Sequence, residues 1–472
     1  MKRFAVGLLL VSGLVCGCRV HQSIDCCTPK TAIPSDFQSE KGERTYDFWW
    51  REYALDSLNG VVESALRNNL ELQQSWWQVV QACAQARIDG SARYPSIDLI
   101  ASASQFNNSG FGFGNDFGGF TGFSGTNATS ELYQLSGALT YEVDLWRRVD
   151  SIAKASCMDM YASREDLDAV ALTLTGTVVD LWFTIQEQLK LLKVIDHQIE
   201  VSRTLLELVE LRFSVGQSSA LDVYQQRLQL ADTESERPRI LSQLATSKNQ
   251  LRVLLGQVPE SNCFDVEPED FYLPPLPDVG SPIELLCNRP DLRAEQRRLL
   301  AADYRIAAAV ADLYPRLDFS LSYGFQATEI RDLFNFELYR IAGEMLMPLF
   351  DAGRRRAQVA KQRAVLCESL SRYSQTFLTA LKEVEDALIQ EKYQLEFIAD
   401  IENEIDLANK NLEEAKYRYV NGLNDYLTVI AAVQSLQGLE RSYVTERKNL
   451  LLIRNKLYRS LGWIGDCRLR VE

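Results

Sequence analysis

The residues that carry most enzyme chemistry are scarce in this chain of 472 residues. There are only two histidines, His21 and His197, and His197 lies in a helical pattern where we expect it to face solvent. The motifs H-E-x-x-H, G-x-S-x-G and G-x-x-x-x-G-K-[ST] are all missing, and no C-x-x-C pair suggests a metal or redox site. The stretch "GFGFGNDFGGF" fails the G-x-G-x-x-G pattern because Phe117 stands where the third glycine belongs. We therefore expect no enzyme, no metal and no cofactor.

One cysteine does predict chemistry, because the N-terminus reads as an export signal. The segment "MKRFAVGLLLVSGLVCGC" has two basic residues, a short apolar run and small residues before Cys18. "VCGC" resembles a bacterial lipobox, whose last cysteine is acylated and holds the mature protein at a membrane. Arg19 follows it, rather than the aspartate that commonly retains lipoproteins at the inner membrane, so the outer membrane is favoured. The alternative is an ordinary signal peptide that is cut elsewhere.

Charge and hydropathy exclude other classes of protein. The formal net charge of −14 argues against nucleic acid as a partner, since phosphate binding needs a positive surface. After the N-terminus no run of roughly 18 apolar residues stands out, so we expect no transmembrane helix.

The chain is one unit written twice. "LRFSVGQSSALDVYQ" at 211–225 returns as "YRYVNGLNDYLTVIA" from 417, which places Gly216 and Gly422 at an offset of 206 residues. Upstream the offset grows to 220, as between "YPSIDL" at 94 and "YPRLDF" at 314. The first copy must therefore carry 14 extra residues, which we place in the Gly- and Phe-rich stretch 107–127.

Beside that stretch the pattern alternates with a period of two. In the second copy the apolar positions are Leu317, Phe319, Leu321, Tyr323 and Phe325, with polar or small residues between them. Such segments are strands of about ten residues with one apolar face, long enough to cross a bilayer when tilted. A soluble, half-buried hairpin would show the same alternation.

Four strands per chain cannot close a barrel alone, because the smallest membrane barrels need about eight. Since open sheet edges are not tolerated in lipid, oligomerisation is expected. Polar residues on one strand face suggest a wet lumen and favour a larger barrel.

Two long helical patterns follow the strands. From 148 to 214 no proline interrupts the chain, and apolar residues recur at spacings of three, four or seven, as in coiled coils. A second segment runs from 352 to 420, and each would extend about 100 Å. Both end at the glycine turns and return through 220–255 and 426–461. The glycine turns are then the far tips of two helical hairpins.

These features together resemble the TolC-like outer membrane efflux proteins, and in particular their lipoprotein branch, over about residues 55 to 465. The most specific matches are "NRPDLRAEQRRLLAADYRIAAAVADLYPRLDFSLSYG", "MPLFDAGRRRAQV", "ALKEVEDAL" and the two glycine turns. The resemblance implies an α+β membrane protein: a homotrimer whose twelve-stranded β-barrel, four strands from each chain, continues into an α-helical coiled-coil tunnel across the periplasm.

The resemblance also divides the chain. The expected segments are a signal peptide (1–17), a lipid-anchored N-terminal segment (18–54), a first efflux repeat (55–256), an irregular equatorial linker (257–281), a second efflux repeat (282–464) and a C-terminal tail (465–472).

The implied function is the outer membrane exit duct of a tripartite efflux or type I secretion system. The duct is passive, and its tips at Gly216 and Gly422 would contact a periplasmic adaptor that links it to an inner-membrane pump. The alternative is a coiled-coil envelope lipoprotein that spaces the layers of the envelope without conducting.

The resemblance further implies a gate at the periplasmic tips. In the family, residues at the positions of Asp222 and Tyr419 hydrogen-bond across neighbouring helical hairpins, and a carboxylate that accepts a phenolic O–H makes a strong bond. The alternative for Asp222 is a capping role at the start of the returning helix. Arg418 and Asp425 complete the candidate gate.

The sequence departs from the family pattern at two places. Arg147 replaces the glycine that usually precedes the first-copy arginine, so that strand-to-helix turn is expected to differ. Thr428 and Ala431 stand where the family often has an acidic ring, which leaves Asp425 as the nearest acidic residue after Gly422.

The lipobox yields the first testable prediction. Mass spectrometry of the mature protein should show an N-terminal Cys18 that carries acyl chains, because the thiol is the acylated group. Cys18→Ala should abolish the acyl mass and leave the precursor uncut before residue 18. An unmodified N-terminus at another residue would contradict the lipoprotein assignment.

Overall fold

The structure is a computed structural model that describes residues 48–109, 127–259 and 272–462, together with isolated positions at 21, 29, 34, 37, 268 and 269. The chain divides into two compact units. The first comprises Met1–Thr28, Gln81–Tyr161 and Arg297–Leu370. The second comprises Pro29–Val80, Ala162–Gln296 and Ser371–Glu472. Cys18 lies outside the described residues.

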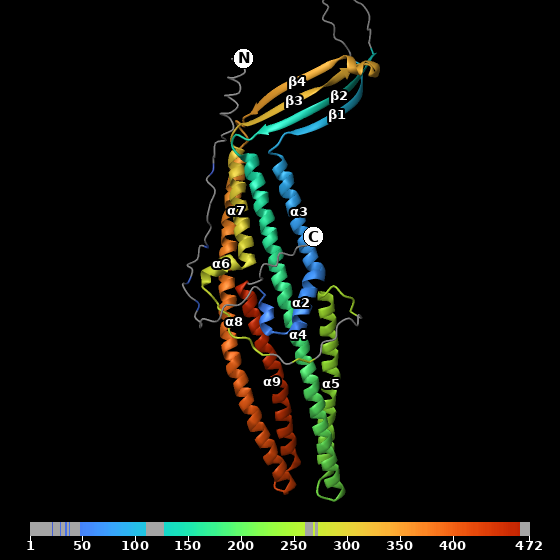
Figure 1. Cartoon of the computed structure of the whole chain (residues 1–472), viewed down its shortest axis with the longest axis vertical. Coiled ribbons are helices and arrows are strands. Elements are labelled where there is room, and N and C mark those ends of the chain that lie inside the picture. The colour runs from blue at the N-terminus through green and yellow to red at the C-terminus, as the bar shows by residue number, and fades with distance from the viewer. Residues whose placement is uncertain are drawn as a thin grey trace, which may run out of the picture. The chain divides into compact units, whose positions relative to one another are not determined.

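The described residues of the first unit contain one four-stranded antiparallel sheet (Figure 1). Its strands are β1 (Ser96–Ser109), β2 (Asn127–Val143), β3 (Arg316–Ala327) and β4 (Glu337–Leu346). The order is β1-β2-β3-β4, so the pairing of β2 with β3 joins the two copies of the repeat into one sheet. Four strands per chain are as the alternating pattern predicts. The outer edges of β1 and β4 have no partner strand among the described residues.

The two hairpins of the sheet differ in length. β1 and β2 have 14 and 17 residues, whereas β3 and β4 have 12 and 10. The 14 additional residues of the first copy therefore do not all lie in a loop. Part of the stretch 107–127 extends the paired strands, with Ser109 opposite Asn127. The expectation of one long loop is wrong at both ends of that stretch.

The strand-to-helix turns of the two copies share an unusual backbone conformation. Arg147 has a φ of 58°, and Gly353, at the corresponding position 206 residues later, has a φ of 86°. A left-handed φ costs a residue with a Cβ about 1–2 kcal/mol, a cost that glycine avoids. The turn at Arg147 thus keeps the left-handed conformation without the glycine. The two turns differ at the residue before this position. Ala352 of the second copy has a positive φ of 52°, whereas Trp146, the corresponding residue of the first copy, does not have a positive φ.

Helical hairpins make up most of the second unit. α4 (Arg148–Ser214) returns as α5 (Ala220–Leu254), and α8 (Arg354–Val420) returns as α9 (Tyr426–Leu461). α4 and α8 have 67 residues each, in agreement with the long uninterrupted patterns. The shorter helices are α2 (Asp56–Asn68), α3 (Leu70–Ser91), α6 (Leu285–Asn288), α7 (Pro290–Ala311) and the 3-10 helices η1 (Trp49–Tyr53), η2 (Pro282–Glu284) and η3 (Ile330–Asn335).

Gly176 allows α9 to approach α4 closely. A Cβ at this position would lie 2.1 Å from Cδ of Arg459. The carbonyl of Gly176 accepts a hydrogen bond of 2.9 Å from Nδ2 of Asn455. The only glycine in α4 therefore marks the point where its backbone contacts α9.

The proline-rich segment is held by a buried arginine of α9. Arg454 is 2% exposed and pairs with Glu391 of α8. Its Nη1 donates to the carbonyls of Pro274 and Pro275, so the guanidinium is satisfied by both a carboxylate and the backbone. The described part of 257–281 contains no helix, as its composition predicts.

One described helix, α4, contains a window that is long and apolar enough to cross a membrane by composition alone. Half of that window is buried within the protein. A helix that packs in the core of a helical hairpin has the same apolar composition, because one of its faces is buried.

The turn at Arg147 can be tested by substitution. Arg147→Gly should raise the midpoint of thermal unfolding, because it removes left-handed strain worth about 1 kcal/mol. The reciprocal change Gly353→Ala should lower the midpoint for the same reason. A lower midpoint for Arg147→Gly would show that side-chain contacts of Arg147 outweigh its backbone strain.

Candidate functional site at the tips of the helical hairpins

The two tips have the same backbone geometry. At the first tip, N–H of Gly216 donates to the carbonyl of Phe213 and N–H of Gln217 donates to that of Arg212. At the second tip, the corresponding bonds run from Gly422 to Tyr419 and from Leu423 to Arg418. This paired arrangement is the Schellman motif, which ends a helix with one left-handed residue.

That left-handed residue is a glycine in both tips. Gly216 has a φ of 74° and Gly422 a φ of 69°, and no atom lies within 4 Å of a Cβ placed on either. Glycine is therefore required by the backbone conformation rather than by lack of space. The repeat seen in the sequence corresponds to a repeated turn.

The side chains that start the returning helices differ between the tips. Ser219 caps α5 by accepting from N–H of Asp222, and Asp222 accepts in return from N–H of Ser219. This reciprocal pair is a capping box. Asp425 occupies the same position at α9, but its side chain makes no capping hydrogen bond.

Asp222 and Tyr419 are linked through Ser218. The Ser218 hydroxyl donates to Oδ2 of Asp222 at 2.7 Å, and the Tyr419 hydroxyl donates to Oγ of Ser218 at 3.2 Å. The sequence predicts a direct bond between Asp222 and Tyr419 of neighbouring hairpins. Within one chain a serine stands between them, and Asp222 also takes the capping role that was the alternative. Ser218 was not anticipated, although it immediately precedes the cap residue.

An arginine covers the Tyr419 ring. The guanidinium carbon of Arg212 lies 4.9 Å from the ring centroid, and Nη1 of Arg212 donates to the carbonyl of Val420 at 3.4 Å. Tyr419 is 8% exposed, so this cation–π contact lies largely away from water. The sequence placed Arg418 in the gate, but Arg418 is exposed and pairs with Glu414 on its own helix. Arg212, one position before Phe213, is the arginine that reaches across to the second hairpin.

Two titratable groups at the tips have shifted pKa values, Asp222 at the first tip and Tyr426 at the second. Partial burial of the Asp222 carboxyl acts to raise its pKa, but hydrogen bonds from Ser218 and Ser219 outweigh this and lower the pKa below its ordinary value. Burial raises the pKa of Tyr426 well above the ordinary value for tyrosine, and the nearby Tyr419 and Asp222 add to this effect. Asp222 is therefore an anion and Tyr426 a neutral phenol at neutral pH.

Buried polar side chains form a hydrogen-bonded layer between α4, α5 and α9, close to the tips. Tyr426 donates to Oε1 of Gln226 at 2.7 Å, and Nε2 of Gln226 donates to the carbonyl of Ser202 at 2.8 Å. Gln229 donates to Oε1 of Gln437 at 3.0 Å. The sequence analysis missed these glutamines. The signal was present, because Gln226 and Gln229 continue the buried stripe that Val223 begins at a spacing of three residues.

Comparison with known proteins assigns the family. Residues 61–257 and 282–463 match the outer membrane efflux protein family. These segments make up most of the chain, which therefore belongs to this family. It is an outer membrane efflux protein and not an enzyme.

Individual relatives agree over nearly the full length. The chain is 28% identical to the pyoverdine export outer membrane protein OpmQ of Pseudomonas putida, over 94% of this chain and 95% of that protein. It is 24% identical to the probable outer membrane lipoprotein SilC of Salmonella typhimurium, over 98% of this chain and all of that protein. Among solved structures, the outer-membrane channel OprN superposes with a TM-score of 0.84 at 25% identity, covering 95% of this chain and 99% of that chain.

Proposed function

We propose that this protein is the exit duct of a tripartite efflux system, built as a homotrimer with a twelve-stranded barrel in the outer membrane. The observation that carries the proposal is the pair of unpartnered outer strands, β1 and β4. Their 14 and 10 residues are long enough to cross a bilayer when tilted.

Unpaired strand edges are unstable in hydrocarbon. Each N–H or C=O group that lacks a partner there costs several kcal/mol, so the edges must pair with other strands. The edge strand β1 of one copy can pair with the edge strand β4 of the next copy. When every copy pairs in this way, the strands form a closed barrel. Four strands per chain then give twelve in a trimer, the number that the family resemblance implies.

The tips present apolar side chains that a single chain leaves exposed. On the first hairpin Val215, Leu221 and Tyr224 are 61–68% exposed, and on the second hairpin Tyr417, Leu423 and Leu427 are 61–67% exposed. Apolar surface on the outer faces of both tips suits contacts with neighbouring copies and with a periplasmic adaptor. The adaptor would connect the duct to an inner-membrane pump, which selects the substrate.

Acylation of Cys18 would add a second attachment to the outer membrane. The lipobox supports this proposal, as does the relative SilC, which is named as a probable lipoprotein.

The oligomer and the channel can be tested together. Native mass spectrometry of the detergent-extracted protein should give three copies, and planar bilayers should show single-channel conductance. As a control, the chain with β4 deleted should lose both properties, because one edge can no longer pair. A stable monomer that does not conduct would overturn the proposal and favour a coiled-coil lipoprotein with a structural role.

We further propose that Asp222 and Tyr419 restrain the tips when no adaptor is bound. The Tyr419–Ser218–Asp222 chain joins the second hairpin to the first. The bond that crosses between the hairpins links two neutral hydroxyls and is worth about 0.5–1.5 kcal/mol, while the Asp222 carboxylate holds the Ser218 hydroxyl in place. A bond of this size can bias a conformational equilibrium and still be broken by a partner. Asp425 and Arg418 lie on the surface of the second tip, where a neighbouring copy could meet them.

Conductance measurements test this gate. Tyr419→Phe and Asp222→Ser should each raise the resting conductance, with little further increase in the double variant. Tyr393→Phe is the matched control, because Tyr393 is 60% exposed on the same helix and lies outside the tip. Since hydrogen bonding lowers the Asp222 pKa, the restraint is present above the ordinary carboxyl pKa of about 4 and is lost as the pH falls through the lower folded value. If both variants conduct like the parent while thermal stability falls, Asp222 is only a cap.

A further inference from the structure

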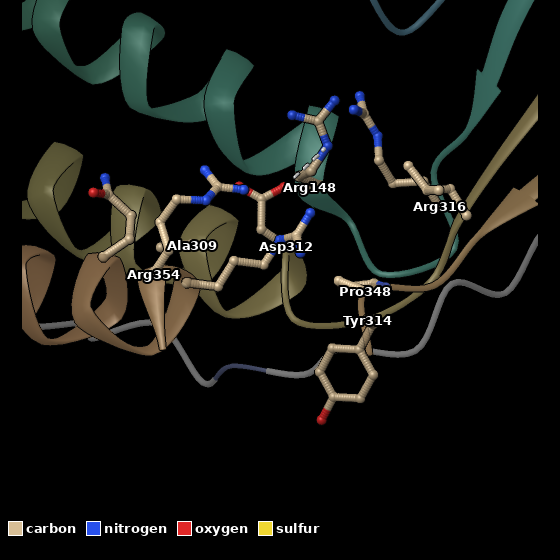
Figure 2. A pocket seen from close by; sticks show the side chains of 10 residues that line it. Arg148, Ala309, Asp312, Tyr314, Arg316, Pro348 and Arg354 are labelled. Carbon is tan, nitrogen blue, oxygen red and sulfur yellow. Dashed lines mark ion pairs between the residues drawn. The ribbon is translucent and has the colours of Figure 1, made fainter. Parts of the chain in front are cut away.

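A cavity rich in arginine lies in the first unit, where the strands meet the helices. Its volume is about 320 Å³, and it is lined by Arg148, Arg316, Arg354, Arg355, Asp312 and Tyr314, among others. The arginines come from separate elements. Figure 2 shows Arg148 at the start of α4, Arg316 at the start of β3 and Arg354 at the start of α8, with Asp312 between Arg148 and Arg354.

The positive charge at this cavity exceeds the negative charge. Glu142 is shared by two arginines, since it accepts from both Arg148 and Arg316. Asp312 lies 3.7 Å from Arg148, and Asp351 lies 3.4 Å from Arg355. Among the side chains that line the cavity, four carry a guanidinium group and one, Asp312, carries a carboxylate.

Arg354 differs from the other arginines that line the cavity. Within the described part of the chain its side chain has no hydrogen-bond or ion-pair partner, although three other guanidinium groups line the same cavity. Bringing like charges together is unfavourable unless an anion neutralises them. Arg354 is exposed, so its guanidinium group is free to meet a negatively charged ligand.

The chemistry of the lining favours phosphate. Planar guanidinium groups bind phosphate oxygens through paired hydrogen bonds, with a geometry that a single ammonium does not offer. Gln358 adds a further polar side chain to the lining.

Exposed apolar side chains lie next to the cavity. Leu346 and Pro348 line it, and the chain continues into Leu349 and Phe350, which are 89% and 91% exposed. A cationic cavity beside strongly exposed apolar residues matches the two parts of a phospholipid, its headgroup and its acyl chains.

We propose that this cavity binds the phosphate of an anionic phospholipid headgroup at the periplasmic surface of the outer membrane. The position of the headgroup rests on the proposed function, because the sheet must cross the bilayer for the ends of its strands to lie at that surface. Free phosphate has the same chemistry and is the other possible source of the ligand.

Native mass spectrometry can test the proposal on the full-length protein. The delipidated protein is titrated with phosphatidylglycerol in detergent, and with inorganic phosphate in a separate arm. Arg354→Gln should weaken phosphatidylglycerol binding by about tenfold, because it removes a charge-assisted hydrogen bond to the phosphate. No observed ion pair is lost in this variant, so folding should be preserved. Arg356→Gln is the matched control, because Arg356 lies two residues further along α8 and does not line the cavity.

Each outcome has a clear meaning. Weaker phosphatidylglycerol binding in Arg354→Gln, but not in Arg356→Gln, supports the headgroup site. If the parent protein binds inorganic phosphate but no phosphatidylglycerol, and Arg354→Gln weakens the binding of phosphate, the site belongs to free phosphate. Equal binding by the parent and both variants overturns the proposal, as would a carboxylate of a neighbouring copy seated on Arg354 in a structure of the oligomer. The same spectra report the oligomeric state. A parent protein that stays monomeric contradicts the proposed trimer, whereas the effect of Arg354 on binding can still be read from the monomer.

Discussion

The unpaired backbone groups along β1 and β4 are the constraint from which the proposed architecture follows. Water can satisfy such groups, but hydrocarbon cannot, so strands of membrane-spanning length need neighbours. Because the two edges belong to the same sheet, copies of the chain can supply them to one another.

Duplication and divergence act on different parts of the tips. The backbone is duplicated, since Gly216 and Gly422 end their helices with the same hydrogen bonds. The side chains have diverged: Ser219 caps its helix while Asp425 does not, and Tyr419 is buried where Phe213 is 48% exposed. A duplicated turn thus supplies the shape of both tips, and the differences between them determine which side chains meet across the hairpins.

Buried polar groups give the helical hairpins a specific alignment. Arg454 joins Glu391 to the carbonyls of the proline-rich segment, and Gln229 joins Gln437 across α5 and α9. Each of these groups has partners only in one alignment of the helices, and a shift would leave it buried and unpaired. Apolar contacts alone would penalise such a shift less strongly.

The sequence by itself determined the repeat, the four strands, the long helices and the glycine turns, because these depend on local periodicity and backbone preference. It also predicted His197 as a solvent-facing residue, which the structure confirms. Other features depend on which side chains from distant segments meet. The tertiary structure decided that Arg212 rather than Arg418 covers Tyr419, and that Ser218 stands between Tyr419 and Asp222. It also brought arginines from α4, β3 and α8 to one cavity, and nothing in their sequence spacing shows that they meet, because the sheet pairing that joins them links residues more than 160 positions apart.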